Sequence, residues 1–196
     1  MKPARVFLVA LFFLLLAGPA TSQSEDDALN QRLDQYMHLS KTLEYEKLME
    51  FIYPKLFDIA PKSAIIETMR QTFESNEMRL GFDSMAVLTV GASFVHKGTE
   101  YRKVDYSMVL RLQLTDTSNL KDTAFINIMN MSLSGSFAGA SVRFERPTGS
   151  WVISGTDFMI AIKEKDQPWM FIGNEKNKLM VETLFPPEVI KKFSLL

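Results

Sequence analysis

The chain contains no cysteine, and this absence excludes several classes of protein at once. A disulfide-stapled scaffold, a thiolate nucleophile, a zinc–thiolate site and a lipid anchor on an N-terminal cysteine are all ruled out. Charged residues form no long run of either sign. Because no basic stretch is present to follow phosphates, we expect no nucleic-acid binding. The hydrophobic core alone must stabilise the fold.

The first 22 residues have the pattern of a secretory signal peptide. Lys2 and Arg5 precede an uninterrupted apolar run over residues 6–17, and small residues follow at 20–22. This run is shorter than the about 20 apolar residues that a membrane-spanning helix needs. We therefore expect cleavage before Gln23. With no second apolar span, the mature protein is expected to be exported, periplasmic or secreted, and free of a membrane anchor.

Cleavage would leave residues 23–196, which have the length of one ordinary domain. A chain of this size buries about 70% of its unfolded surface, so it needs no covalent staples. Loss of Lys2 and Arg5 leaves 20 basic residues against 23 acidic ones, a net charge of −3. We expect a single domain over this range.

The N-terminal part of the mature chain predicts helices. Its apolar residues recur at spacings of three and four, in two stripes separated by a slip near residues 41–42; they are Leu29, Leu33, Tyr36, Met37 and Leu43, then Tyr45, Leu48, Met49 and Ile52. The slip indicates two successive helices with a bend. Pro54 and Pro61 are each expected to open a further helix, because proline is tolerated in a first turn.

From residue 76 onward the apolar period changes to two, which predicts strands. The clearest one covers 104–114, where only Val109 interrupts the polar side. This alternation is typical of an antiparallel sheet with one face wet. A short helix around 125–131 is expected to precede a loop at 132–139, and Pro186 to open a small terminal helix. The remaining expected strands cover 82–90, 94–96, 142–145, 151–153, 156–164 and 168–172.

Helices followed by a meander of strands predict the α+β class. We expect the N-terminal helices to pack on a strongly curved antiparallel sheet. A long helix lying in such a sheet leaves a hollow, and hollows of this kind tend to bind small ligands.

Three segments carry a resemblance to a known family, namely 45–57 (YEKLMEFIYPKLF), 159–163 (MIAIK) and 169–171 (WMF). With them the chain resembles the NTF2-like, cystatin-like α+β superfamily, and more narrowly its exported bacterial members of unassigned function. The likeness spans nearly the whole mature chain and implies a cone-shaped fold. It implies no particular activity, because this fold hosts enzymes, binding modules and transport factors alike.

Six aromatic residues lie on or beside the elements expected to enclose the hollow: Tyr53, Phe57, Phe73, Tyr106, Trp151 and Trp169. Aromatic side chains with a polar tip can line a pocket and still offer a hydrogen bond to a ligand. The alternative interpretation is that they only fill the core, since each buries a large area.

Catalytic groups for this hollow are hard to find. Ketosteroid isomerase, an enzyme of the same fold, uses an aspartate base and a tyrosine-containing oxyanion hole. Here Asp105 precedes Tyr106 on one strand, so the two point to opposite faces and Asp105 cannot act on a ligand beside Tyr106. Asp157 alternates with Phe158 and Ile160, which we expect to be buried. Both acids are therefore expected to lie outside the hollow.

The two histidines are His38 and His96, and we expect neither to have an acidic partner. We expect both at the surface, although histidine titrates near neutral pH. Two separated histidines without cysteine or an acidic cluster make a poor metal-ligand set. The sequence thus predicts no catalytic residue, no metal and no cofactor.

Three hypotheses for function follow. The first is a non-catalytic exported domain that binds a small apolar ligand or a protein partner. The second is a small-molecule isomerase or lyase of the same fold, which needs an ionisable side chain inside the hollow. The third is a structural module that forms a homodimer through the open face of its sheet.

Overall fold

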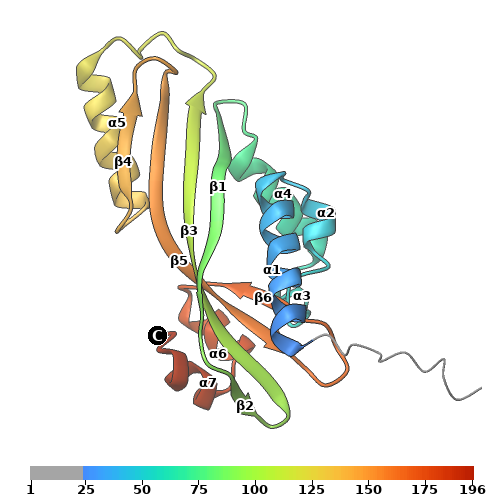
Figure 1. Cartoon of the computed structure of the whole chain (residues 1–196). Coiled ribbons are helices and arrows are strands. Elements are labelled where there is room, and N and C mark those ends of the chain that lie inside the picture. The colour runs from blue at the N-terminus through green and yellow to red at the C-terminus, as the bar shows by residue number, and fades with distance from the viewer. Residues whose placement is uncertain (1–23) are drawn as a thin grey trace, which may run out of the picture.

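The computed structural model of the chain describes residues 24–196, so the expected signal peptide lies outside the described range. The chain belongs to the α+β class (Figure 1). Helices come first, a sheet interrupted by one helix follows, and two short helices end the chain. The predicted class is confirmed.

Four helices form the N-terminal part: α1 (Glu25–Lys41), α2 (Tyr45–Leu48), α3 (Leu56–Ile59) and α4 (Lys62–Phe73). The bend predicted near residues 41–42 is present, and Leu43 there has a φ of 56°. The second helix is shorter than its apolar stripe suggested. It ends at Leu48 because the backbone beyond it pairs with a strand, with the Phe171 amide donating to the Phe51 carbonyl at 2.7 Å.

The six strands form one antiparallel sheet with the order β1-β3-β5-β4, in which β2 pairs with β3 and β6 with β5. The path is open, so β1 and β4 are not joined. Their bounds are β1 (Met78–Val90), β2 (Phe94–His96), β3 (Thr99–Leu114), β4 (Ser141–Glu145), β5 (Ser150–Lys163) and β6 (Met170–Gly173). The two strands expected at 151–153 and 156–164 are one strand, because Ser154 and Gly155 stay paired with β3.

Helix α5 (Thr123–Ser136) is longer than expected. The side chain of Asp122 caps it by accepting the Ala124 amide at 2.8 Å. The predicted loop at 132–139 is wrong over its first half, because buried Leu133 anchors that turn in the core. Two helices follow the sheet, α6 (Lys178–Leu184) and α7 (Pro187–Phe193). The second is the predicted terminal helix, and α6 was not expected.

The buried side chains form three clusters. The α1 cluster includes Leu29, Leu33, Val104, Met159, Trp169 and Phe171. The α5 cluster includes Leu110, Leu112, Ile126, Leu133, Trp151 and Ile153. The C-terminal cluster includes Tyr101, Ile160, Ile162, Val181, Leu184 and Val189.

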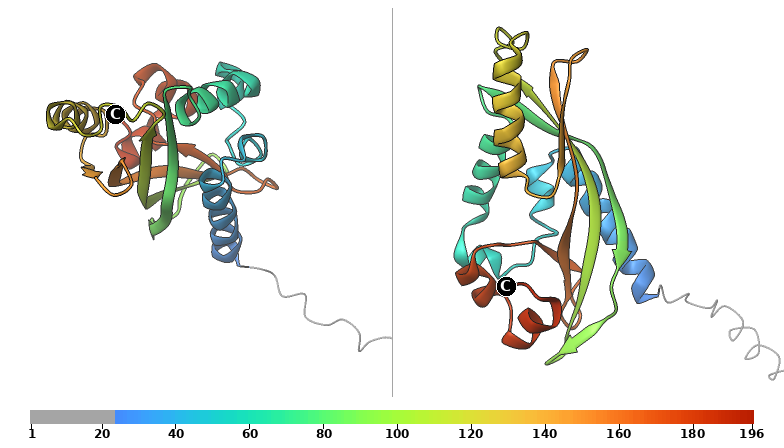
Figure 2. Two further views of the ribbon diagram at one scale, coloured as in Figure 1. Left: turned by 90° about the horizontal axis from the view of Figure 1, so that it is seen from above. Right: turned by 90° about the vertical axis from the view of Figure 1, so that its left-hand side faces the viewer.

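The pairing of β3 with β5 assigns these clusters to faces. It runs from residue 100 to 113 without a register shift, so Val104 and Leu112 lie on one face, which we name the inner face. The α1 and α5 clusters therefore share the inner face, at different places along the strands. The C-terminal cluster lies on the outer face. In Figure 2, α5 lies near one end of the molecule and α6 and α7 lie near the other.

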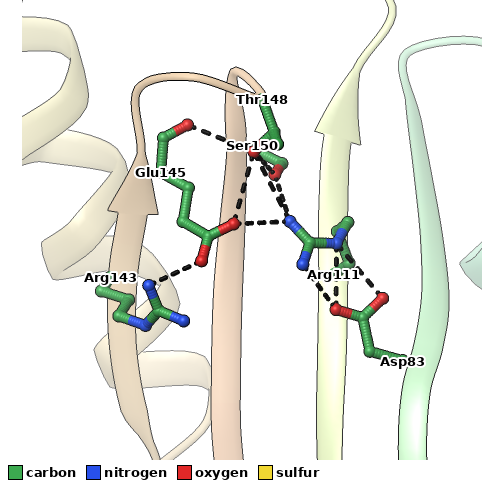
Figure 3. Close-up of polar contacts among 6 residues, drawn as sticks. All are labelled: Asp83, Arg111, Arg143, Glu145, Thr148 and Ser150. Atoms are coloured by element: carbon green, nitrogen blue, oxygen red, sulfur yellow. Dashed lines mark hydrogen bonds and ion pairs between the residues drawn. The ribbon is translucent and has the colours of Figure 1, made fainter.

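Arg111 projects from the outer face at the end of the sheet that α6 and α7 do not reach (Figure 1). Figure 3 shows its polar contacts. Its guanidinium donates to Asp83 Oδ2 at 2.6 Å, to Glu145 Oε2 at 2.8 Å and to Ser150 Oγ at 2.8 Å. These contacts link β1, β3, β5 and β4. The hydrogen bonds that Arg111 donates to Asp83 and Glu145 raise the pKa of Arg111, and the bond to Glu145 also lowers the pKa of that carboxyl. The predicted wet face thus exists at this end of the sheet, and Lys103 and Asp105 on the same face are also partly exposed.

Candidate functional site

A small pocket lies on the inner face, where α1, α2 and α4 meet β1 and β3. We name it the tyrosine pocket. Its volume is about 140 Å³. An apolar cavity of about 150 Å³ is large enough to bind benzene, so the tyrosine pocket has room for one small ring. Its wall residues include Tyr36, Tyr45, Met69, Phe73, Phe82, Met85, Tyr106 and Met108.

Each element supplies its part of the wall from its apolar side. Helix α1 contributes Tyr36 from the stripe that also buries Leu33 and Met37. Helix α4 contributes Met69 and Phe73 from its half-buried side. The strands contribute side chains that alternate with solvent-facing ones. The pocket thus forms where these helices and strands leave a gap between the α1 cluster and the α5 cluster.

Tyr106 supplies the unpaired polar group of this pocket. Its hydroxyl makes no hydrogen bond with any residue of the described range. By contrast, the Tyr45 hydroxyl donates to Glu74 Oε1 at 3.3 Å, and the Tyr36 hydroxyl interacts with the Ser40 side chain, which opposes the rise that burial causes in the pKa of Tyr36. Burial raises the pKa of Tyr106, as do the negative charge of Asp157 and that of an ionised Tyr36. Tyr106 therefore remains a neutral donor at neutral pH.

Asp157 lies on the inner face, contrary to the expectation. It pairs directly with Tyr106 across β3 and β5, so both side chains leave the sheet on the same side. The expectation was wrong because both faces of β5 are buried here. Met159 belongs to the α1 cluster on one face and Ile160 to the C-terminal cluster on the other. Burial of Phe158 and Ile160 therefore does not place Asp157 in solvent. The Asp157 carboxylate accepts from Asn174 Nδ2 at 2.7 Å.

Asp105 lies where the sequence placed it, on the outer face. It accepts from Thr89 Oγ1 at 2.8 Å and lies 3.5 Å from Lys103 Nζ. It has no access to the tyrosine pocket.

Of the six aromatic candidates, Phe73 and Tyr106 come together in the tyrosine pocket. Tyr53 lies in the C-terminal cluster and donates to Glu164 Oε1 at 2.7 Å. Phe57 is half-buried and packs on the α1 cluster.

The two tryptophans are core residues of different clusters. Trp151 belongs to the α5 cluster and donates to Asn130 Oδ1 at 2.9 Å. Trp169 belongs to the α1 cluster, and its indole N–H has no partner in the described range.

Two aromatic residues of the tyrosine pocket, Tyr36 and Phe82, were not among the six candidates. The helical stripe of α1 already marked Tyr36 as inward-facing.

His38 is exposed on α1, as expected. His96 differs, because its side chain is only 15% exposed and its Nε2 lies 3.6 Å from Glu188 Oε2 on α7. The expectation that His96 lacks an acidic neighbour is therefore wrong. Its partner comes from a distant segment, which residue spacing does not reveal. Within residues 24–196, no group of three or more acidic or histidine side chains is placed to hold a metal ion.

A larger polar cleft adjoins the tyrosine pocket. Its volume is about 770 Å³, and its charged wall residues are Lys41, Glu74, Arg79, Asp83 and Arg111. Leu43, Phe73 and Phe82 line both spaces, so they form the boundary between them. The rings of Phe73 and Phe82 lie 5.4 Å apart, centre to centre.

No family model matches the chain, and no curated protein is similar to it in sequence. Of the helices in the described range, none combines the length and the apolar character needed to cross a membrane. The assignment of function therefore depends on the geometry of the site.

Proposed function

We propose that this protein is a non-catalytic binding domain, and that it takes a small apolar ligand in the tyrosine pocket. The observation that carries the proposal is the free hydroxyl of Tyr106 within a mostly apolar wall. An apolar cavity with one unpaired donor favours a ligand with an apolar body and a single hydrogen-bond acceptor.

The size of the pocket limits the ligand to about one ring. Burial of about 100 Å² of apolar ligand surface contributes about 2.5 kcal/mol, and one hydrogen bond about 1 kcal/mol. Together, about 3.5 kcal/mol limits the Kd of a single ring to about 3 mM or weaker, because the lost freedom of the ligand must also be offset. Tighter binding requires further contacts outside the tyrosine pocket.

The same proposal takes the fold as an NTF2-like cone and the location as outside the cytoplasm. Support for the cone comes from the order of helices before an antiparallel sheet and from the segment around Tyr53 and Pro54. Support for export comes from the basic and apolar pattern of residues 1–22.

Protein-observed NMR with labelled methionine methyl groups tests binding, with p-cresol and toluene as a pair of probes that differ by one hydroxyl. We expect both to bind and to shift resonances of Met85 and Met108. Tyr106→Phe should weaken p-cresol and leave toluene unchanged. Tyr101→Phe is the matched control, because Tyr101 is buried on the outer face. Shifts confined to other residues, or no shift at all, would contradict the proposal.

The second candidate function, a small-molecule isomerase or lyase, is favoured by the position of Asp157. A carboxylate on the same face as a neutral phenol can act as a base while the phenol stabilises a developing oxyanion. Asp157 does not line the tyrosine pocket, so the substrate would have to extend beyond it. Proton exchange into a ketone probe, followed by NMR with wild type and Asp157→Asn, distinguishes this function from simple binding.

A further inference from the structure

We propose that the ligand of the tyrosine pocket carries a single negative charge, such as a carboxylate, which Lys41 and Arg79 hold in the polar cleft. This inference rests on the proposed binding function and identifies the class of ligand.

The first step is the shared wall. Leu43, Phe73 and Phe82 line both the tyrosine pocket and the polar cleft. The proposal requires that a ligand with its apolar ring in the smaller space extends a chain between these side chains into the larger one. The larger space is open and charged, so the group that enters it must be polar.

The second step is the charge of the polar cleft. Arg111 is neutralised there, since its guanidinium donates to Asp83 at 2.6 Å and to Glu145 at 2.8 Å. One carboxylate oxygen of Glu74 already has a partner, because it accepts a hydrogen bond from the Tyr45 hydroxyl at 3.3 Å.

Lys41 and Arg79 remain. Neither makes an ion pair or a side-chain hydrogen bond with any residue in 24–196. The charged wall holds three cations and two acids, so its excess is one positive charge. A monoanion matches that excess, whereas a dianion exceeds it.

Together with the acceptor that Tyr106 favours, these two steps define a ligand with one small ring that carries a hydrogen-bond acceptor, a flexible linker and a terminal carboxylate. The contribution of the charge is modest, because exposed ion pairs change affinity by about two- to fivefold each. It is also screened, since the Debye length falls to about 10 Å at about 0.1 M salt.

Titration calorimetry or NMR with three related probes tests the inference: 4-(4-hydroxyphenyl)butyrate, the neutral 4-(4-hydroxyphenyl)butanol and its phosphate ester at the chain end. At low salt we expect the carboxylate to bind about fivefold more tightly than the alcohol. The difference should shrink at about 0.3 M salt, where the Debye length is shorter. In the double variant Lys41→Gln/Arg79→Gln the carboxylate should bind no better than the alcohol, and the alcohol should be unaffected.

Lys165→Gln serves as the matched control, because Lys165 is exposed and lies outside the polar cleft. It should keep the preference for the carboxylate. An unchanged Tm in the double variant shows that its fold is intact.

The outcomes separate the two proposals. If the alcohol binds as tightly as the carboxylate, the anionic head group is wrong and the apolar pocket stands. If the phosphate binds more tightly than the carboxylate, the assignment of a monoanion is overturned. If none of the three probes binds, the proposed binding function itself fails.

Discussion

Asp157 lies directly opposite Tyr106 in the pairing of β3 with β5, so a carboxylate and a phenol leave the inner face of the sheet side by side. The negative charge of Asp157 is one of the causes that raise the pKa of Tyr106. This relationship joins the tyrosine pocket to an acidic group that leaves the same face directly beside Tyr106.

Asp157→Asn is expected to lower the pKa of Tyr106. The neutral amide no longer opposes the phenolate charge, while burial continues to raise the pKa. Ultraviolet absorbance titration of the tyrosines measures the change. Asp105→Asn is the control, because Asp105 lies on the outer face and should leave Tyr106 unchanged. An equal shift in both variants would show that the effect is one of overall charge.

Alkaline pH is expected to destabilise the protein. Burial raises the pKa of all five tyrosines, to about 12 for Tyr45. In the unfolded chain these phenols lose their protons near pH 10, whereas the folded protein still holds them. The unfolded state then binds fewer protons, so the free energy of unfolding falls as the pH rises above about 10.

Urea unfolding at a series of pH values from 8 upward measures this fall. Tyr45→Phe should reduce the slope between the pKa of the unfolded phenol and about pH 12, since one raised pKa is removed. A stability that stays constant above pH 10 would contradict the prediction.

The sequence was sufficient for features that depend on local pattern. The alternation around Tyr106 predicted β3, and Pro186 and Pro187 predicted the start of α7, because both are set by neighbours in the chain. It was insufficient where distant segments meet. The partner of His96 is Glu188 on α7, and the second helix ends early because Phe51 pairs with Phe171. No spacing within one segment contains that information.

The candidate site shows the same division. Aromatic character marked Phe73 and Tyr106 correctly as inward-facing, yet it marked Trp151 and Trp169 equally, and both are fully buried. The sequence did not reveal which face of β5 adjoins the pocket, because helices cover both faces of this strand near Ile160. Burial on both faces removes the polar alternation on which such a prediction depends.

Arg111→Gln is expected to lower the Tm, because it removes the contacts that link β1, β3, β5 and β4 at an uncovered part of the outer face. High salt should reduce the difference from wild type, since these charges are partly exposed. Arg143→Gln is the matched control. Arg143 is 62% exposed and contacts Glu145 alone, at 2.6 Å, so its loss should change the Tm less. A larger effect of Arg143→Gln would show that the network does not centre on Arg111.

Leu133→Ala tests whether the last turns of α5 are part of the core. Leu133 is 8% exposed within the α5 cluster, and truncation of a buried leucine costs about 2–5 kcal/mol of unfolding free energy through lost burial and the cavity left behind. Ile128→Ala on the same helix is the control. Ile128 is 65% exposed and alanine is the better helix former, so this change should stay within about 0.5 kcal/mol of wild type. Chemical denaturation of both variants gives the comparison. Similar free energies for the two would mean that the helix ends before Leu133, as the Ser- and Gly-rich sequence there first suggested.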